Sequence, residues 1–313
     1  NEGHSFGITA AGGAGWQLGE WIVDGEPTID MLGVDPRRFG DYASQSYLIK
    51  KNEEAYASVF TVHYPDEERE AARPLRQAPC YDRLKACGAV FGQKFGWERA
   101  NWFAPKGIDQ KDDWSFRRSK WFEHVGNECK NVQDNVGLLD MTAFAKCRIS
   151  GPGAEEYLDN LVANKLPRKN GRVNLCHALN TQGGVHSEFT IAKEKQNSFY
   201  LVSAGAFQRL DHDWMFKWLP NNRSVSFENL TNSVGVLVIA GPKARKLMQK
   251  VSPSTNFSNE AFPWLSAEKI DVNLAPSIAI RMNFVGELGW ELHHPIEYQN
   301  HIFDKLMENG KDL

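Results

Sequence analysis

Two acidic residues interrupt an otherwise apolar stretch near the end of the chain, and their type and position suit chemistry. In RMNFVGELGWELHHP, residues 281–295, these residues are Glu287 and Glu291. An ionised carboxylate is costly to bury unless donors replace the hydrogen bonds that water made to it. Glu291, inside the apolar run, therefore requires either solvent or a partner, and that partner could be a ligand.

A further candidate carboxylate lies in NTQGGVHSEFTI, residues 180–191. The first five residues are typical of a hairpin loop, and a strand is predicted from Val185 onward. Strict alternation along this strand places Glu188 on the same face as His186 and Thr190. Such alternation is common where one strand face meets water, so simple solvation of Glu188 is the alternative to a functional site.

The opening of the chain is rich in glycine. The run GITAAGGAGWQLGEWIVDG, residues 7–25, includes Gly13 and Gly15 next to a helical pattern, but its spacing misses GxGxxG. A helix N-terminus with bare backbone N–H groups favours developing negative charge, such as that of a reduced flavin ring. Close helix packing through glycine is the alternative interpretation.

Composition describes an ordinary chain of 313 residues, 42% hydrophobic and 24% charged, with room for two domains. A net charge of -3 gives no overall attraction to nucleic acid or anionic membranes, and no apolar run of about 18 residues predicts a membrane span. The five cysteines include no CxxC, which favours a reducing compartment, either bacterial cytoplasm or mitochondrial matrix. His177, His186 and Glu188 follow no recognised zinc spacing, so we predict no metal site.

Two strand-Gly-Pro-helix units lie about ninety residues apart, in RISGPGAEEYLDNLV and VGVLVIAGPKARKLMQKV. Their similarity predicts two related halves in which Ala154, Leu158, Ala244 and Leu247 face a core. Because strands follow strands with helices interspersed, the predicted fold class is α+β. We divide the chain into residues 1–22, a connecting region 23–78 and a long unit 79–313.

Several of these segments resemble, in the same order, the dimethylglycine and sarcosine dehydrogenase family. The run GHSFGITAAGGAGWQLGEWIVDGEPTIDMLGVDPRRFG resembles the tail of the FAD-binding domain and the start of the connecting region. The later runs VGLLDMTAFAKCRISGPGAEEYLDNLVAN, LNTQGGVHSEFTI and FVGELGWELHHP resemble the folate-binding aminomethyltransferase domain that this family shares with the glycine-cleavage T-protein. The resemblance implies an α+β aminomethyltransferase domain with antiparallel or mixed sheets and flanking helices. We expect the chain to be an internal fragment.

The resemblance also implies roles for particular residues. Glu188 falls on the family's acidic residue beside the reactive folate nitrogen, where an aspartate is usual, and is the implied catalytic residue. Glu291 falls on the last glutamate of YTGExGxE, which binds the pterin. Phe284 and Leu175 replace family tyrosines in the cofactor site, whereas Glu287 is expected to be structural or exposed. In the tail of the FAD-binding domain, Gly13 and Gly15 are the residues implied to lie near the flavin.

The implied reaction uses FAD and tetrahydrofolate and acts on a small N-methyl amine such as dimethylglycine or sarcosine. A flavin takes hydride from the amine, and the resulting iminium carbon passes to tetrahydrofolate. Two alternatives remain open: a regulatory relative without turnover, and a folate-dependent demethylase without flavin. We expect Glu188 and Glu291 to line one cavity with Phe284 in its wall. We also expect a short strand end and the helix of the opening segment to stand without most of their sheet, which would leave Trp16 and Trp21 exposed.

Overall fold

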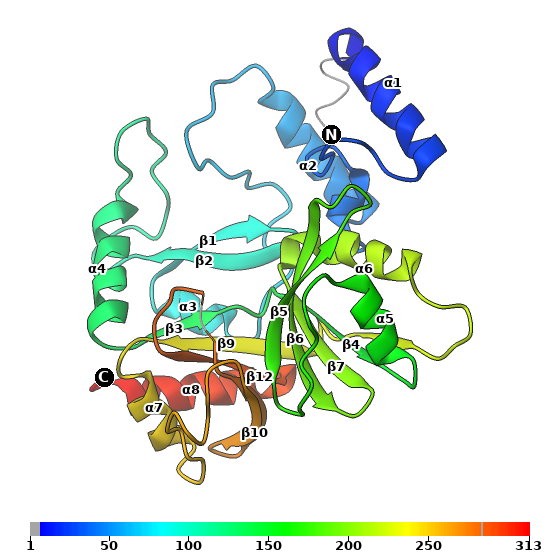
Figure 1. The fold of residues 1–313 in the computed structure, drawn as a ribbon. Coiled ribbons are helices and arrows are strands. Elements are labelled where there is room, and N and C mark those ends of the chain that lie inside the picture. The colour runs from blue at the N-terminus through cyan, green and yellow to red at the C-terminus, as the bar shows by residue number, and fades with distance from the viewer. Residues whose placement is uncertain (1–6, 283) are drawn as a thin grey trace.

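The N-terminal part of the chain is mainly helical, and α1 stands apart from the sheets (Figure 1). The computed structural model describes residues 7–282 and 284–313. The elements before the large sheets are α1 (Gly7–Asp24), η2 (Pro36–Phe39), α2 (Gln45–Ala57), α3 (Tyr81–Ala86), β1 (Ala89–Lys94), β2 (Trp97–Phe103) and α4 (Trp121–Asp134). None of the helices in the described ranges is long and apolar enough to cross a membrane.

Helix α1 buries little of its surface. Trp16 is 68% exposed, whereas Trp21 is partly buried, with the Arg37 guanidinium 4.8 Å from its ring centroid. The expected exposure is therefore confirmed for Trp16 but not for Trp21, which an Arg37 cation–π contact partly covers. The strand end expected before this helix falls on residues 1–6, which lie outside the described residues.

Two five-stranded antiparallel sheets form the rest of the molecule. Sheet 1 has the order β5-β6-β7-β4-β8, and sheet 2 has the order β10-β11-β12-β9-β3. The strands of sheet 1 are β4 (Ala145–Ser150), β5 (Val173–Leu179), β6 (Val185–Lys195), β7 (Ser198–Ser203) and β8 (Ser226–Asn229). Those of sheet 2 are β3 (Gly137–Asp140), β9 (Val234–Ala240), β10 (Ala267–Val272), β11 (Ala275–Ile280) and β12 (Gly289–Pro295).

Both strand-Gly-Pro-helix units form as predicted. Strand β4 leads through Gly151 into α5 (Ala154–Leu161), and β9 leads through Gly241 into α7 (Ala244–Val251). Each strand is second from one edge of its sheet. The glycines have φ angles of 114° and 131°, and a Cβ on either would lie 2.4 Å from a backbone carbonyl oxygen. Only glycine fits such a turn, which explains the shared motif.

The four marker residues of these two helices are all buried: Ala154, Leu158, Ala244 and Leu247. The predicted core faces of both units are therefore confirmed. Truncation of a fully buried leucine to alanine costs about 2 to 5 kcal/mol, so these faces contribute substantially to stability.

The two halves exchange a strand. Strand β3 directly precedes β4 in the chain but pairs with β9 in sheet 2, and β8 directly precedes β9 but pairs with β4 in sheet 1. The exchanged strands end at Asp140 and Asn229, whose side chains each accept the backbone N–H of a threonine two residues later at 3.0 Å. Each sheet therefore contains one strand contributed by the other half.

Four layers result from this arrangement. The outer face of sheet 1 packs against α5 and α6 (Gln208–Lys217), and the outer face of sheet 2 packs against α7 and α8 (Gln299–Gly310). Short 3-10 helices, η3 (Gly205–Phe207) and η4 (Ile296–Tyr298), lead into α6 and α8. Between the sheets lies a smaller cluster that includes Ala192, Tyr200, Val202 and Ile280. The candidate carboxylates belong to strands that border this central layer.

Candidate functional site

Glu188 lies on β6 directly opposite His177 on β5. Its Oε2 is 3.0 Å from Nε2 of His177, and its side chain remains 44% exposed. The hairpin that sets this register is held by Asn180, whose Oδ1 accepts the backbone N–H groups of Gln182 and Gly184. A short asparagine side chain commonly stabilises a turn in this way. The hairpin thus presents Glu188 as an accessible, hydrogen-bonded carboxylate.

The face that Glu188 occupies is the inner face of sheet 1. Along β6, Glu188 is in phase with Thr190 and Ala192, and Ala192 packs in the cluster with Ile280 of sheet 2. Leu175 is directly opposite Thr190 and is 37% exposed, so it is a near neighbour of Glu188 on this face. The structure therefore brings together two of the residues assigned to the site from the sequence.

His186 does not share this face, and the prediction that it would is wrong. The β5–β6 register shifts between Ala178 and Leu179, and this irregularity places an extra residue in β6. The His186 ring packs on Trp214 of α6, with ring centroids 4.2 Å apart, and Ser187 donates to Asp211 of the same helix. A β-bulge reverses the alternation locally, which strict sequence periodicity cannot reveal.

Glu291 lies on β12 and is 4% exposed. Its neighbours Trp290 and Leu292 pack in the core with α7 and α8, so Glu291 points toward sheet 1. Its Oε2 is 3.1 Å from Nε2 of His293, whose Nδ1 is 2.9 Å from the hydroxyl of Tyr200 on β7. Among the described residues His293 is the one hydrogen-bond partner of this carboxylate, so Oε1 remains available as an acceptor.

The segment before β12 holds two further residues of the site prediction. Phe284 is 76% exposed, so its ring contributes no packed wall in the protein alone. Glu287 is partly exposed in the turn before β12, as expected for a residue of structural or surface type. Both residues are thus accessible beside the strand that carries Glu291.

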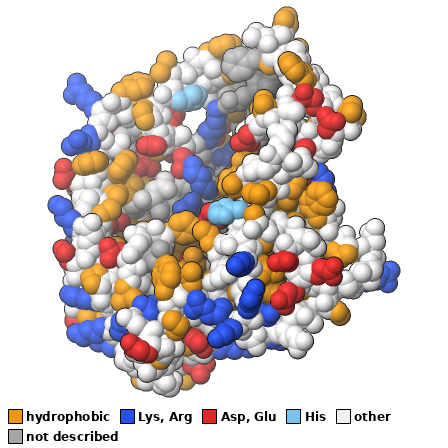
Figure 2. Space-filling model, viewed as in Figure 1, with side chains coloured by type: hydrophobic (Ala, Val, Ile, Leu, Met, Phe, Trp, Pro, Cys, Tyr) orange, Lys and Arg blue, Asp and Glu red, His pale blue; other side chains and the backbone are white. Residues whose placement is uncertain are grey.

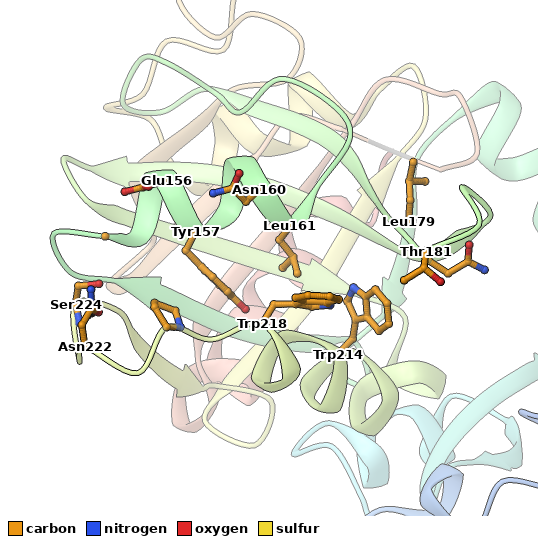
Figure 3. A pocket seen from close by; sticks show the side chains of 13 residues that line it. Glu156, Tyr157, Asn160, Leu161, Leu179, Thr181, Trp214, Trp218, Asn222 and Ser224 are labelled. Carbon is orange, nitrogen blue, oxygen red and sulfur yellow. Dashed lines mark hydrogen bonds between the residues drawn. The ribbon is translucent and has the colours of Figure 1, made fainter. Parts of the chain in front are cut away.

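Two cavities of the molecule are not lined by either candidate glutamate. One of about 450 Å³ lies between α5 and α6 and is lined by Tyr157, Leu161, Trp214 and Trp218 (Figure 3). Another of about 410 Å³ lies between the sheets and is bordered by Tyr200. Neither of the two is lined by Glu188 or Glu291. The carboxylates lie on inner faces of opposed sheets, and their convergence on one cavity stays a prediction.

Gly13 and Gly15 lie in the interior of α1 rather than at its N-terminus. A Cβ added at either position would meet nothing within 4 Å. The anion-stabilising helix end considered from the sequence is therefore not formed by these glycines, and close packing through them is also not observed. The expected place of Gly13 and Gly15 near a flavin stays a prediction.

The sequence prediction missed the contributions of three residues. His177 was considered only as a metal ligand, whereas it pairs with Glu188 across the strands. His293 follows Glu291 by two residues, and strand alternation alone would have placed the two side chains together. Tyr200 comes from a different sheet and has no local sequence signal. The described residues hold no cluster of three His, Cys, Asp or Glu side chains that could bind a metal ion.

Acidic and basic side chains are mixed over the face of the molecule seen in Figure 2. This distribution agrees with the small net charge of -3.

Comparison with known proteins covers almost the whole chain. The family model of the GCVT N-terminal domain matches residues 80–313, and that of the FAD dependent oxidoreductase central domain matches residues 24–78. Mitochondrial dimethylglycine dehydrogenase of Mus musculus is 36% identical over 312 residues, which are 99% of this chain and 36% of that protein. 4-methylaminobutanoate oxidase (formaldehyde-forming) of Paenarthrobacter nicotinovorans is 30% identical over 99% of this chain and 38% of that protein.

The chain thus spans little more than a third of the length of these relatives. Among solved structures, glycine cleavage system aminomethyltransferase T from Bartonella henselae has a TM-score of 0.60 at 19% identity, covering 74% of this chain and 57% of that one. The predicted α+β fold class, with antiparallel sheets and flanking helices, is confirmed.

Proposed function

Since this chain belongs to the GCVT N-terminal domain family over residues 80–313, we propose that it carries the one-carbon transfer step of an oxidative demethylation. The whole protein would act on a small N-methyl amine of the dimethylglycine or sarcosine type, with FAD and tetrahydrofolate as cofactors. The names of the relatives, which include a dimethylglycine dehydrogenase and a methylaminobutanoate oxidase, support this substrate class.

The observation that carries the proposal is the pair of carboxylates on opposed sheet faces. Glu291 is buried with one oxygen unpartnered among the described residues, which fits a ligand that presents adjacent N–H groups, as a pterin does. One carboxylate can accept both N–H groups, and these bonds compensate for its desolvation. Glu188, accessible and ionisable, suits a group that faces positive charge on the reacting amine.

Tetrahydrofolate, when bound, supplies the N5 nucleophile that takes the carbon of the iminium left after the flavin has accepted two electrons as hydride. The residues of this chain would bind and orient. Glu291 would fix the pterin edge, Leu175 and the exposed Phe284 ring would supply apolar contacts, and Glu188 would stabilise positive charge as the carbon–nitrogen bond to the departing amine breaks.

The flavin part of the proposal rests on the match of residues 24–78 to the FAD dependent oxidoreductase central domain. We derive no step for Gly13 and Gly15 of α1, where an added Cβ would meet nothing within 4 Å. We propose the domain division 1–22, 23–78 and 79–313 on this basis. The mitochondrial relatives favour the matrix as the location if the source is eukaryotic.

Titration with tetrahydrofolate tests the site in the full-length protein. Glu291→Gln should weaken binding by about 1.5 to 3 kcal/mol, because the amide puts a donor against the ligand's donors. Glu188→Gln should spare binding and lower the yield of methylenetetrahydrofolate in a single turnover. Glu287→Gln, in the turn before β12, is the matched control and should leave both unchanged. Wild-type affinity in Glu291→Gln would contradict the folate assignment.

A further inference from the structure

A chain of hydrogen bonds links the two sheets at Glu291. The hydroxyl of Tyr200 on β7 lies 2.9 Å from His293 Nδ1, and His293 Nε2 lies 3.1 Å from Glu291 Oε2. The three residues are 3%, 2% and 4% exposed, so water does not compete freely for these bonds. The Tyr200 and His293 rings meet edge to face, with centroids 5.4 Å apart, which holds the imidazole plane.

The order of donors follows from the Glu291 carboxylate, which can only accept, together with the Tyr200 hydroxyl, which can donate. Burial raises the pKa of Tyr200 well above its usual value, so the hydroxyl keeps its proton. A neutral imidazole has one N–H and one acceptor nitrogen. With the Tyr200 O–H donating to Nδ1, the imidazole proton is on Nε2 and donates to the Glu291 carboxylate.

We propose that Tyr200 and His293 are positioning residues for Glu291: the Tyr200 hydroxyl donates to His293 Nδ1 and holds the imidazole so that its Nε2–H orients the carboxylate toward its ligand. The proposal rests on the proposed function of Glu291 as the pterin-binding group. It extends that function to a residue of sheet 1 and so ties ligand affinity to the packing of the two sheets.

The surroundings make this partner essential. Opposite Glu291 on the neighbouring strands stand Ile280 and Val238, and opposite His293 stand Ile278 and Val236. An apolar environment raises the cost of an ionised carboxylate that lacks a donor. The other titratable groups that interact electrostatically with Tyr200 are Cys147 and Arg148 on β4 and Glu194 on β6, while His293 and Lys146 interact with His294 on β12. Arg148 is already paired with Glu194 at 2.7 Å, so it does not replace His293.

Tyr200→Phe removes the donor to His293 Nδ1 and should leave the imidazole free to turn, so that Nε2–H no longer holds the Glu291 carboxylate in one orientation. At pH 8.5 the full-length Tyr200→Phe protein should bind tetrahydrofolate about tenfold more weakly than wild type.

Two variants at residue 293 test whether an N–H donor to Glu291 matters beyond the size of the side chain. His293→Gln keeps an N–H donor for Glu291 and should bind more tightly than His293→Leu, which has none, by about tenfold. Tyr157→Phe is the matched control, because it removes another buried tyrosine hydroxyl, one that donates to the Met215 carbonyl at 2.6 Å on the far side of sheet 1. It should bind like wild type.

Histidine side-chain ¹⁵N NMR provides a readout that needs no ligand. Wild type should show His293 protonated at Nε2, with the Nδ1 resonance displaced by the hydrogen bond from Tyr200, and Tyr200→Phe should lose that displacement. This loss together with the weaker binding supports the proposal. An Nδ1–H form in wild type, or an unchanged Nδ1 resonance in Tyr200→Phe, overturns it whatever the folate result. Absence of tetrahydrofolate binding by wild type instead refutes the proposed function, while the tautomer measurement still decides whether Tyr200 positions His293.

Discussion

Asp211 on α6 is a buried carboxyl group whose ionisation should destabilise the protein. It is 2% exposed, and its two oxygens accept the hydroxyls of Ser187 and Ser203, both at 2.6 Å. Burial raises its pKa from 3.8 to about 6, although the two serine hydroxyls oppose the shift. No cationic side chain is paired with it in the described part of the chain, so the charge is compensated by neutral donors alone.

The sign and size of the effect follow from linkage. Between pH 4 and 6 the folded protein holds a proton on Asp211 that the unfolded chain has released, so stability falls as the pH rises through this window. Raising the pKa of Asp211 from 3.8 to about 6 corresponds to about 3 kcal/mol of folding stability, because one pKa unit is about 1.36 kcal/mol. Asp211→Asn removes this cost but gives up a charge-assisted bond from a serine. The net gain at pH 7 should be about 1 to 3 kcal/mol.

Urea unfolding of wild type and variant at several pH values between 4 and 8 measures the difference in unfolding free energy. The difference should be small at pH 4, grow up to pH 6 and then stay constant. Asp213→Asn is the control, since Asp213 lies on the same helix but pairs at the surface with Arg209 and should change stability by less than about 1 kcal/mol without this pH profile. If Asp211→Asn is less stable than wild type at pH 7 and shows the same pH dependence, the reasoning about burial is refuted.

Gly151→Ala should lower the unfolding free energy by about 2 to 4 kcal/mol, because the backbone φ at this position is 114° and the added Cβ would clash with a carbonyl oxygen. The control is Gly126→Ala in helix α4, where the added Cβ would meet no atom within 4 Å, and it should be neutral or stabilising. Thermal unfolding of both variants checks this. Burial lowers the pKa of Lys146 from 10.5 to about 7, so above pH 7 the unfolded chain binds more protons than the folded protein. The unfolding free energy should therefore rise toward pH 10. Urea titration should find no such rise in Lys146→Met. Glu98→Gln breaks a buried ion pair between β2 and the connecting region and should accelerate limited proteolysis of residues 64–79, while Asp304→Asn, in an exposed pair, should not.

Local sequence determined the secondary-structure units and the fold class of this protein, because the patterns that encode them are short. The two strand-Gly-Pro-helix units, the hairpin before Glu188 and the α+β class all depend on residues within about one helical turn or one strand of each other. Periodicity and turn chemistry act over such distances. The order of the motifs was enough to identify the family resemblance, which the match of residues 80–313 confirms.

Only the tertiary structure decided which strands pair and which side chains meet across them. The exchange of β3 and β8 between the sheets depends on contacts between residues about a hundred positions apart, and no local pattern encodes it. The bulge that turns His186 toward α6 results from the register of the partner strand and from packing of the His186 ring on Trp214. The same holds for the partners of the two glutamates. His177 meets Glu188 because a register aligns them, and Tyr200 meets His293 because two separate sheets pack face to face.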